Sequence, residues 1–215
     1  MVRPTRNIDQ QLIEAGRALL AETGCRGFSI RELTDAAGVN LGMFHYHFKT
    51  RDNFLAVVLQ NVYEEMFASL TFQAHADRAH LENLRAAVNV LGRFSRDNRL
   101  LLRRLMADMM AGEAIAQQFF RNNVPRHLGV MAGLIADAQR ADELPPMAIF
   151  QAMSFIAGAV AMPIMMATAL QHEGFAPPPL MANLDNDVLS DVAIAQRVDM
   201  ALYGLQLATK RPAYD

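Results

Sequence analysis

Several residue types and patterns are scarce in this chain of 215 residues. Cys25 is the only cysteine, so an internal disulfide is excluded and the chain fits the reducing cytosol. The polar N-terminus MVRPTRNIDQ is followed by no apolar core of the kind that signal peptides contain. We therefore expect a cytoplasmic protein. Its length and its 52% of hydrophobic residues allow a core that needs no disulfide.

Clusters of catalytic or metal-binding residues are also missing. Two ligands on one helix need a spacing of three or four residues, whereas His45 and His47 are two apart and point about 200° away from each other. His75 and His80 are five apart, and no acidic or cysteine partner completes a site. No serine or cysteine lies in a recognisable nucleophile motif. The sequence therefore predicts no enzyme, no metal site and no cofactor.

One long uncharged run, AMSFIAGAVAMPIMMATAL at residues 152–170, reaches the length of ~18 residues at which a membrane span is considered. Pro163 interrupts it, most of its residues are alanine and methionine, and no lysine or arginine flanks it closely. We interpret it as a helix buried on all sides. A helical, membrane-associated interaction protein remains an alternative.

The patterns that are present are helical. Ser29 and Glu32 form an S-x-x-E capping box, Gly38 ends that short helix, and Asn40 can start the next one. Two short helices joined by a three-residue turn with glycine predict a helix-turn-helix. Thr50 then caps a long helix.

Helix signals also fill the remaining sequence. Asn7 can cap a first helix that ends at Gly24. The segment GFAPPPLMANLDN should be an extended or turned loop, because it contains three consecutive prolines. Later helices are expected at residues 79–96, 98–111, 113–140, 145–171 and 187–208. The prediction is an all-α fold of about nine helices, with a three-helix domain over residues 1–50 and a larger helical domain over residues 51–215.

The segment GVNLGMFHYHFKTRDNF, residues 38–54, contains the second helix of the helix-turn-helix. Such a helix enters the DNA major groove, and its exposed face needs side chains that reach phosphates and base edges. Phosphates also favour cations and free amides at the start of the next helix. Val39, Phe44 and Phe48 should form the packing side. The groove side should hold Asn40, Leu41, Gly42, Met43, His45 and Tyr46, followed by Lys49 and Arg51.

Residues 7–60 resemble the DNA-binding domain of the TetR/AcrR family of transcriptional regulators. The first helix ending in Thr23-Gly24, then FSIRELTDAAGV, then GMFHYHFKTRDNFL carry the resemblance, over about a quarter of the chain. His45 stands where the family usually has a tyrosine that touches phosphate. A histidine can donate the same hydrogen bond, but its charge depends on pH. The resemblance implies DNA contacts by Ser29, Arg31, Leu41, Gly42, Met43, His45, Tyr46, Lys49 and Arg51, and by His47, which aligns with a family residue that is often partly structural.

The resemblance also implies that the larger domain forms a homodimer and holds an effector. A two-fold DNA reader needs associated protomers, and the last two helices of each protomer would make a four-helix bundle. The expected seam of the final helix is Val188, Val192, Ala195, Val198, Leu202 and Leu205. Methionine and aromatic residues line adaptable apolar sites, although they are also ordinary core residues. The pocket candidates are Met106, Met109, Met110, Phe119, Phe120, His127, Met131, Phe150 and Met153.

Together these features predict a ligand-responsive transcriptional regulator that binds double-stranded operator DNA. We expect a repressor that a small hydrophobic or aromatic effector releases from its operator. The alternative within the same class is a DNA-binding regulator without a small-molecule inducer.

Overall fold

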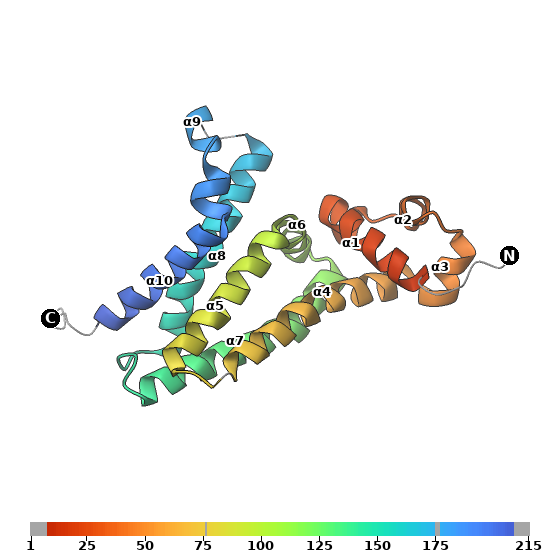
Figure 1. Cartoon of the computed structure of the whole chain (residues 1–215). Coiled ribbons are helices and arrows are strands. Elements are labelled where there is room, and N and C mark those ends of the chain that lie inside the picture. Colours follow the sequence, from red (N-terminus) through yellow and green to blue (C-terminus); the bar gives the residue numbers. More distant parts are fainter. Residues whose placement is uncertain (1–7, 76, 175–176, 209–215) are drawn as a thin grey trace. The chain divides into compact units, whose positions relative to one another are not determined.

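The computed structural model describes residues 8–75, 77–174 and 177–208, and Figure 1 shows that every regular element within them is a helix. The all-α fold expected from the sequence is confirmed. In chain order the elements are α1 (Ile8–Gly27), α2 (Ile30–Ala37), α3 (Leu41–Phe48), α4 (Arg51–Ala74), α5 (His80–Asp97), α6 (Arg99–Met110), α7 (Ala114–Arg140), α8 (Ile149–Glu173), α9 (Pro178–Met181), the π-helical turn η1 (Asp185–Leu189) and α10 (Asp191–Leu207).

The proline-rich segment differs from its expectation. It contains the short helix α9, so the described residues form ten α-helices rather than about nine. Proline suits the first turn of a helix, because its φ is already helical and its missing N–H has no helical partner there. Asn7, the expected cap of the first helix, lies outside the described residues.

The chain divides into two compact units. The first, which we call the head, consists of the described residues up to Glu65 together with Leu100–Asn123. The second, the body, consists of Met66–Arg99 and the described residues from Val124 onward. Helices α4 and α7 each continue from one unit into the other. The division into domains at residues 50 and 51 remains a prediction.

Local capping contacts form the helix-turn-helix of the head. The Ser29 hydroxyl accepts a hydrogen bond from the backbone N–H of Glu32 at 3.4 Å, and Asn40 Oδ1 accepts one from Met43 at 3.0 Å. Between the two caps, Gly38 adopts a φ of +64°, which costs glycine little. The predicted starts of α2 and α3 and the predicted end of α2 are confirmed.

An aromatic cluster forms the core of the head. The rings of Phe28, Phe44 and Phe48 surround Phe54, with centroid distances to that ring of 5.6, 5.5 and 4.8 Å. Phe44 and Phe48 were predicted as the packing side of α3, and both are buried. Gly16 of α1 lies so close that an added Cβ would be 2.4 Å from Phe54 Cζ. Helix α1 therefore packs directly on the cluster.

Helix α1 has a sharp kink at Gly24. This residue has φ +70° and ψ −178°, a combination that only glycine adopts readily, and helical hydrogen bonding resumes beyond it as far as Gly27. The predicted end of the helix at Gly24 therefore corresponds to a break inside a longer element. An added Cβ at Gly24 would also lie 2.6 Å from Asp108 Oδ2. Backbone conformation and available space both require glycine here.

The residue after the kink is held from two sides. The N–H of Cys25 donates to Asp108 Oδ2 of α6 at 2.5 Å, and the Arg51 guanidinium donates to the Cys25 carbonyl. Arg51 Nε also donates to the Phe28 carbonyl at 3.3 Å. The first residue of α4 and a buried carboxylate of α6 thus fix the turn between α1 and α2.

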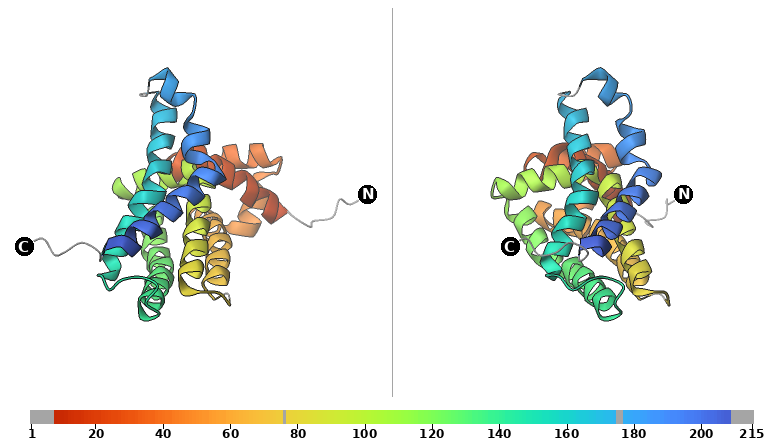
Figure 2. Two further views of the ribbon diagram at one scale, coloured as in Figure 1. Left: turned by 60° about the vertical axis from the view of Figure 1, so that its left-hand side comes forward. Right: turned by 90° about the vertical axis from the view of Figure 1, so that its left-hand side faces the viewer.

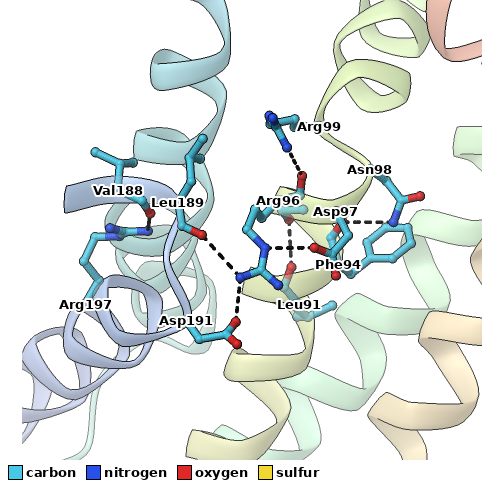
Figure 3. A network of polar contacts seen from close by, with 11 residues as sticks. Leu91, Phe94, Arg96, Asp97, Asn98, Arg99, Val188, Leu189, Asp191 and Arg197 are labelled. Atoms are coloured by element: carbon cyan, nitrogen blue, oxygen red, sulfur yellow. Dashed lines mark hydrogen bonds and ion pairs between the residues drawn. The ribbon is translucent and has the colours of Figure 1, made fainter. Parts of the chain in front are cut away.

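In the body, α5, α8 and α10 lie side by side, as both views in Figure 2 show. Gly92 of α5 permits this close approach, because an added Cβ would lie 2.7 Å from Ile194 and 3.0 Å from Val160. An arginine on the same helix reaches the start of α10, as Figure 3 shows. Arg96 donates to Asp191 at 2.5 Å and to the Leu189 carbonyl at 3.3 Å. These contacts fix α10 against α5.

Helix α8 is not buried on all sides, so that expectation is wrong. By length and composition alone its stretch Ile149–His172 would suffice to cross a membrane, but only 28% of the most apolar 18 residues of this stretch are buried. The body covers one side of the helix. The other side leaves apolar residues exposed: Phe150, Phe155, Met162 and Met166.

Several residues of α10 that we expected at the dimer contact are instead buried within the protomer. Val198, Leu202 and Leu205 face the core of their own protomer, and Leu202 is only 1% exposed. The apolar residues that α10 leaves exposed are Val192, Met200, Tyr203 and Leu207. A repeat near 3.5 residues marks an apolar face but does not reveal which neighbour covers it.

Candidate functional site

The exposed face of α3 collects several residues predicted to contact DNA. The helix buries its two phenylalanines, while Gly42, His45, Tyr46 and Lys49 are exposed at the spacing of one helical face. Tyr46 is 78% exposed, which is unusual for a large aromatic side chain in a folded unit. Asn40, Leu41 and Arg31 are also exposed. On this surface Gly42 leaves the backbone uncovered, and the aromatic, imidazole and cationic side chains of Tyr46, His45 and Lys49 lie beside it.

A tight turn follows α3 and orders two of these residues. Lys49 has a φ of +64°, and the N–H of Thr50 donates to the Phe48 carbonyl at 2.7 Å. The His45 ring lies against this turn, with its Nδ1 3.1 Å from the Lys49 carbonyl oxygen. Thr50 Oγ1 in turn accepts from the N–H of Asn53 at 3.2 Å and caps α4, as predicted. The imidazole is therefore oriented by the backbone that carries the lysine.

Arg51 makes internal contacts. Besides the two carbonyls described above, its guanidinium donates to Asp52 at 2.9 Å. Its role as a phosphate contact remains a prediction, and its structural role is to hold the turn that precedes α2. Ser29, Met43 and His47 are only half-buried, and the Ser29 oxygen already serves as a helix cap.

A separate cavity of about 200 Å³ lies in the body. It is almost entirely apolar, and its polar contributions come from Ser95 and His127. The Ser95 hydroxyl donates to the Leu91 carbonyl at 2.8 Å. The walls come from α5, α7 and α8: Val88, Leu91, Gly92, Ser95, His127, Leu128, Met131, Met153, Ile156, Ala157, Val160 and Ala161.

The structure brings together three of the nine residues predicted to line a pocket, namely His127, Met131 and Met153. Phe150 is exposed on the outer side of α8. The other five belong to the head, where they line no part of this cavity: Met106, Met109, Met110, Phe119 and Phe120.

Sequence reasoning missed two groups of residues. The small side chains that open the cavity, such as Gly92 and Ala161, give no signal without knowledge of which helices meet. Asp108 was also missed, although it is buried at the kink of α1, because its partner Cys25 is 83 residues away. A lone acidic residue on the apolar side of α6 was the one available hint.

The thiol of Cys25 and the possible metal ligands among the described residues have distinct chemical properties. Burial, together with the nearby carboxylate of Asp108, raises the pKa of the Cys25 thiol to about 12. This thiol is therefore protonated and unreactive near neutrality. Within residues 8–75, 77–174 and 177–208, no group of three His, Cys, Asp or Glu side chains is arranged to hold a metal ion.

Comparisons with known proteins agree with this geometry. Residues 12–58 match the family described as bacterial regulatory proteins, tetR family. The HTH-type transcriptional repressor KstR2 of Rhodococcus jostii is 28% identical over 57 residues. That match covers 26% of this chain and 28% of the repressor, so it is confined to a segment shorter than a third of either protein.

The whole fold also matches solved structures. The fatty acid degradation regulator FadR of Bacillus halodurans superposes with a TM-score of 0.69 at 15% identity, covering 95% of this chain and 99% of that one. The regulator FadR of Bacillus subtilis, solved in complex with stearoyl-CoA, gives a TM-score of 0.64 at 13% identity, covering 92% and 97%. At such identities the likeness concerns the fold.

Proposed function

The chain belongs to the TetR family of bacterial regulatory proteins, and from this premise we propose that it is a homodimeric, cytoplasmic transcriptional repressor. A small apolar effector bound in the body would release it from its operator. The observation that carries the proposal is the exposed face of α3, which sits on a helix-turn-helix whose caps and core are complete. The family is one of DNA-binding regulators, not enzymes.

Recognition of DNA is assigned to α3. Tyr46 and Lys49 share its exposed face, so replacing both by alanine removes an aromatic contact and a phosphate contact without touching the core. Each contact contributes about 1–3 kcal/mol, so specific binding should be lost in the double variant. A matched control removes an exposed aromatic and an exposed cation elsewhere, Phe72→Ala with Arg140→Ala. Unchanged operator affinity in the first double variant contradicts the assignment.

Dimerisation is assigned to the apolar side of α8 and α10 that the protomer leaves uncovered. Large exposed apolar patches on a soluble protein mark interaction sites, and two helices from each protomer suit a four-helix bundle. The patch contains Phe155, Met162, Met166, Val192, Met200 and Tyr203. Two-fold pairing would also present two copies of α3 to DNA, which a two-fold operator requires.

The exposed methionines allow a matched test of this interface. Met200→Glu places an unpaired carboxylate in the proposed contact, which costs several kcal/mol when desolvated. Met110→Glu makes the same change on α6, and the two side chains are 69% and 77% exposed in the protomer. Sedimentation should show monomers for the first variant and dimers for the second. Two dimeric variants would place the interface elsewhere.

Effector binding is assigned to the cavity between α5, α7 and α8. Its volume of about 200 Å³ lies below the ~300–1,000 Å³ typical of pockets for drug-sized ligands. The site therefore suits a small aromatic group or a short acyl chain, with Ser95 and His127 as polar contacts. The stearoyl-CoA bound by Bacillus subtilis FadR makes acyl-CoA esters the first compounds to test.

The binding test uses a series of acyl-CoA esters from butyryl- to stearoyl-CoA, together with benzoyl-CoA. A ligand at 100 times its Kd stabilises the folded protein by ~2.7 kcal/mol, which thermal unfolding detects. Met153→Ala changes the cavity wall, whereas Met109→Ala removes a half-buried methionine of the head. The first variant should shift the preferred chain length, and the second should not. If no ester stabilises the wild-type protein, the regulator without an inducer becomes the better description.

Communication between ligand and DNA is assigned to the helices shared by the two units. Asn123 of α7 is 2% exposed and exchanges two amide hydrogen bonds of 3.2 Å with Gln60 of α4, while the Tyr63 hydroxyl donates to its carbonyl at 2.8 Å. His127, a residue of the cavity wall, follows one helical turn later on α7. A shift of α7 on ligand binding would displace α4, which begins at the turn formed by Lys49 and Thr50 after α3. Operator should then weaken effector binding by the same factor as effector weakens operator binding.

A further inference from the structure

The turn between α3 and α4 is strained at Lys49. This residue has φ +64° and ψ −56°, and the hydrogen bond from Thr50 N–H to the Phe48 carbonyl closes a three-residue turn. Such a turn is rare for a residue with a side chain, because its Cβ approaches the backbone carbonyl. A conformation of this kind persists only where neighbouring groups support it.

His45 supplies that support. Its Nδ1 lies 3.1 Å from the carbonyl oxygen of Lys49. A carbonyl oxygen has no proton and can only accept, so the hydrogen in this contact belongs to Nδ1. The neutral imidazole carries a single N–H, and the turn uses it. In the neutral ring, Nε2 is therefore left as an acceptor.

This assignment decides when His45 can bind a phosphate. Phosphate oxygens are acceptors, so a neutral ring held in this way offers them a lone pair instead of a donor. The imidazolium ion donates from both nitrogens and carries a positive charge, which makes the hydrogen bond to phosphate charge-assisted. A tyrosine hydroxyl, by contrast, can donate throughout the neutral pH range.

The surroundings of His45 leave the ring available to an operator. It is exposed, and its ring contact is with Phe44, edge to face at a centroid distance of 5.4 Å. Helix α3, its C-terminal turn, and the neighbouring helices α1, α2 and α4 also carry charged or titratable groups. These are Tyr46, His47, Lys49, Arg31, Glu32, Asp35, Arg51 and Asp52, together with Asp9, Glu14, Arg17, Glu22 and Arg26 of α1.

We propose that operator binding by this chain takes up protons, one at the His45 of each protomer. The proposal rests on the proposed function, because it requires α3 to lie on DNA. The complex holds more protons than the free protein and DNA, so linkage makes operator affinity fall as pH rises. The protein would bind its operator tightly in mildly acidic conditions and release it as pH rises toward 8.

The test measures fluorescence anisotropy of a labelled duplex that the wild-type protein has selected from a random pool at pH 6. Between pH 6 and pH 8 at constant ionic strength, the wild-type Kd should rise at least about tenfold, because each protomer loses a charge-assisted hydrogen bond. His45→Tyr should bind with nearly the same Kd at both pH values. His45→Phe should bind weakly at both, and His47→Gln should keep the wild-type dependence. Circular dichroism at both pH values confirms that each variant is folded.

Two results overturn the proposal while leaving DNA recognition intact. These are a wild-type Kd that does not change with pH, and a His45→Tyr variant whose Kd rises as steeply as that of the wild type. A second measurement needs no DNA, since nitrogen NMR of the free protein at pH 8 reports which ring nitrogen of His45 carries the proton. Protonation at Nδ1 is expected, and protonation at Nε2 overturns the proposal. A wild-type chain that selects no duplex at either pH overturns the proposed function as well.

Discussion

The head and the body differ in how completely side chains fill their interiors. In the head, four phenylalanine rings gather around one another, and Gly16 brings α1 against Phe54 with no space for a methyl group. In the body, three helices meet around a cavity of about 200 Å³ and leave an apolar side of α8 and α10 uncovered. The unit to which we assign DNA binding is closely packed around its aromatic cluster. A unit assigned to bind a ligand and a second protomer keeps unfilled space and an open face.

The largest expected effect is a loss of stability, and it tests the difference in interior packing between the head and the body. Phe44→Ala in the head should lower the free energy of unfolding by about 3–5 kcal/mol, because a fully buried ring leaves a void that the close-packed cluster cannot close. Met153→Ala in the body should cost less than half as much, because it enlarges a space that already exists.

Urea unfolding followed by circular dichroism measures both values, at one fixed protein concentration because the proposed dimer couples stability to concentration. Equal losses in the two variants would contradict the contrast between a filled and an unfilled unit.

The next effect compares two glycines with nearly equal φ. Gly24 in the head has φ +70°, and an added Cβ would lie 2.6 Å from Asp108 Oδ2; Gly174 in the body has φ +69° and no atom within 4 Å of that position. Gly174→Ala should cost about 1–2 kcal/mol for the left-handed backbone alone. Gly24→Ala should cost at least about 1 kcal/mol more for two reasons. Its ψ of −178° lies outside the left-handed helical region that Gly174 occupies with ψ 24°, and the added methyl group displaces the carboxylate from the Cys25 N–H.

Combining Gly24→Ala with Asp108→Ala separates the two causes. The double variant should lose less stability than the sum of the single variants, since the steric conflict and the hydrogen bond involve the same carboxylate. Simple additivity would show that Asp108 does not hold the kink.

A third prediction concerns the contact between α7 and α4 within the head. Asn123→Leu keeps the number of side-chain heavy atoms but breaks the amide pair with Gln60. It changes neither a residue of the cavity wall nor a residue of α3. With whichever acyl-CoA binds, operator should reduce wild-type effector affinity about 5- to 150-fold, the usual range of allosteric coupling. The variant should bind each ligand alone almost normally and show a factor closer to one. Calorimetric titrations with and without operator measure it, and an unchanged factor would remove Asn123 from the route.

How much of this could be foreseen depended on distance along the chain. The caps at Ser29, Asn40 and Thr50 were predicted correctly because each involves residues three positions apart. The contact of Asp108 with the α1 kink spans 83 residues and leaves no local pattern.

Helical periodicity has a related limit. The periodicity identified Leu202 as part of an apolar face. It could not show whether that face packs in the core of the same protomer or against a partner. The predicted pocket residues carry the same ambiguity, because methionines and phenylalanines such as Met109 and Phe119 are equally suited to packing in the head. Residues that line a cavity are defined by which helices meet, and a single sequence does not state this.

The smallest effect near neutral pH should come from the thiol of Cys25, whose pKa burial raises to about 12. The group is neutral in the folded and unfolded states near pH 7, so it makes stability neither rise nor fall between pH 6 and pH 8. Above about pH 9 the unfolded chain loses the thiol proton first, so stability should fall as pH rises toward 12.

Thiol labelling at pH 8 tests the same property. Native Cys25 should remain unlabelled, whereas an exposed cysteine in the body, introduced as Ser154→Cys in a Cys25→Ala background, should react rapidly. Labelling of the native wild-type protein at the rate of the body cysteine would show that the head opens as readily as the body surface.

Because Leu100–Asn123 belongs to the head, the ribosome synthesises residues 66–99 of the body before it synthesises the last part of the head. At about 5–20 residues per second, several seconds separate the emergence of Glu65 from that of Asp108. During this interval the nascent helix-turn-helix has its aromatic core but lacks the carboxylate that holds the Cys25 turn. A nascent chain stalled before α6 should therefore be open to proteases at the α1 kink. The exposed face of α3, the proposed DNA-binding surface, would mature only after α5, which supplies one wall of the cavity, has been synthesised.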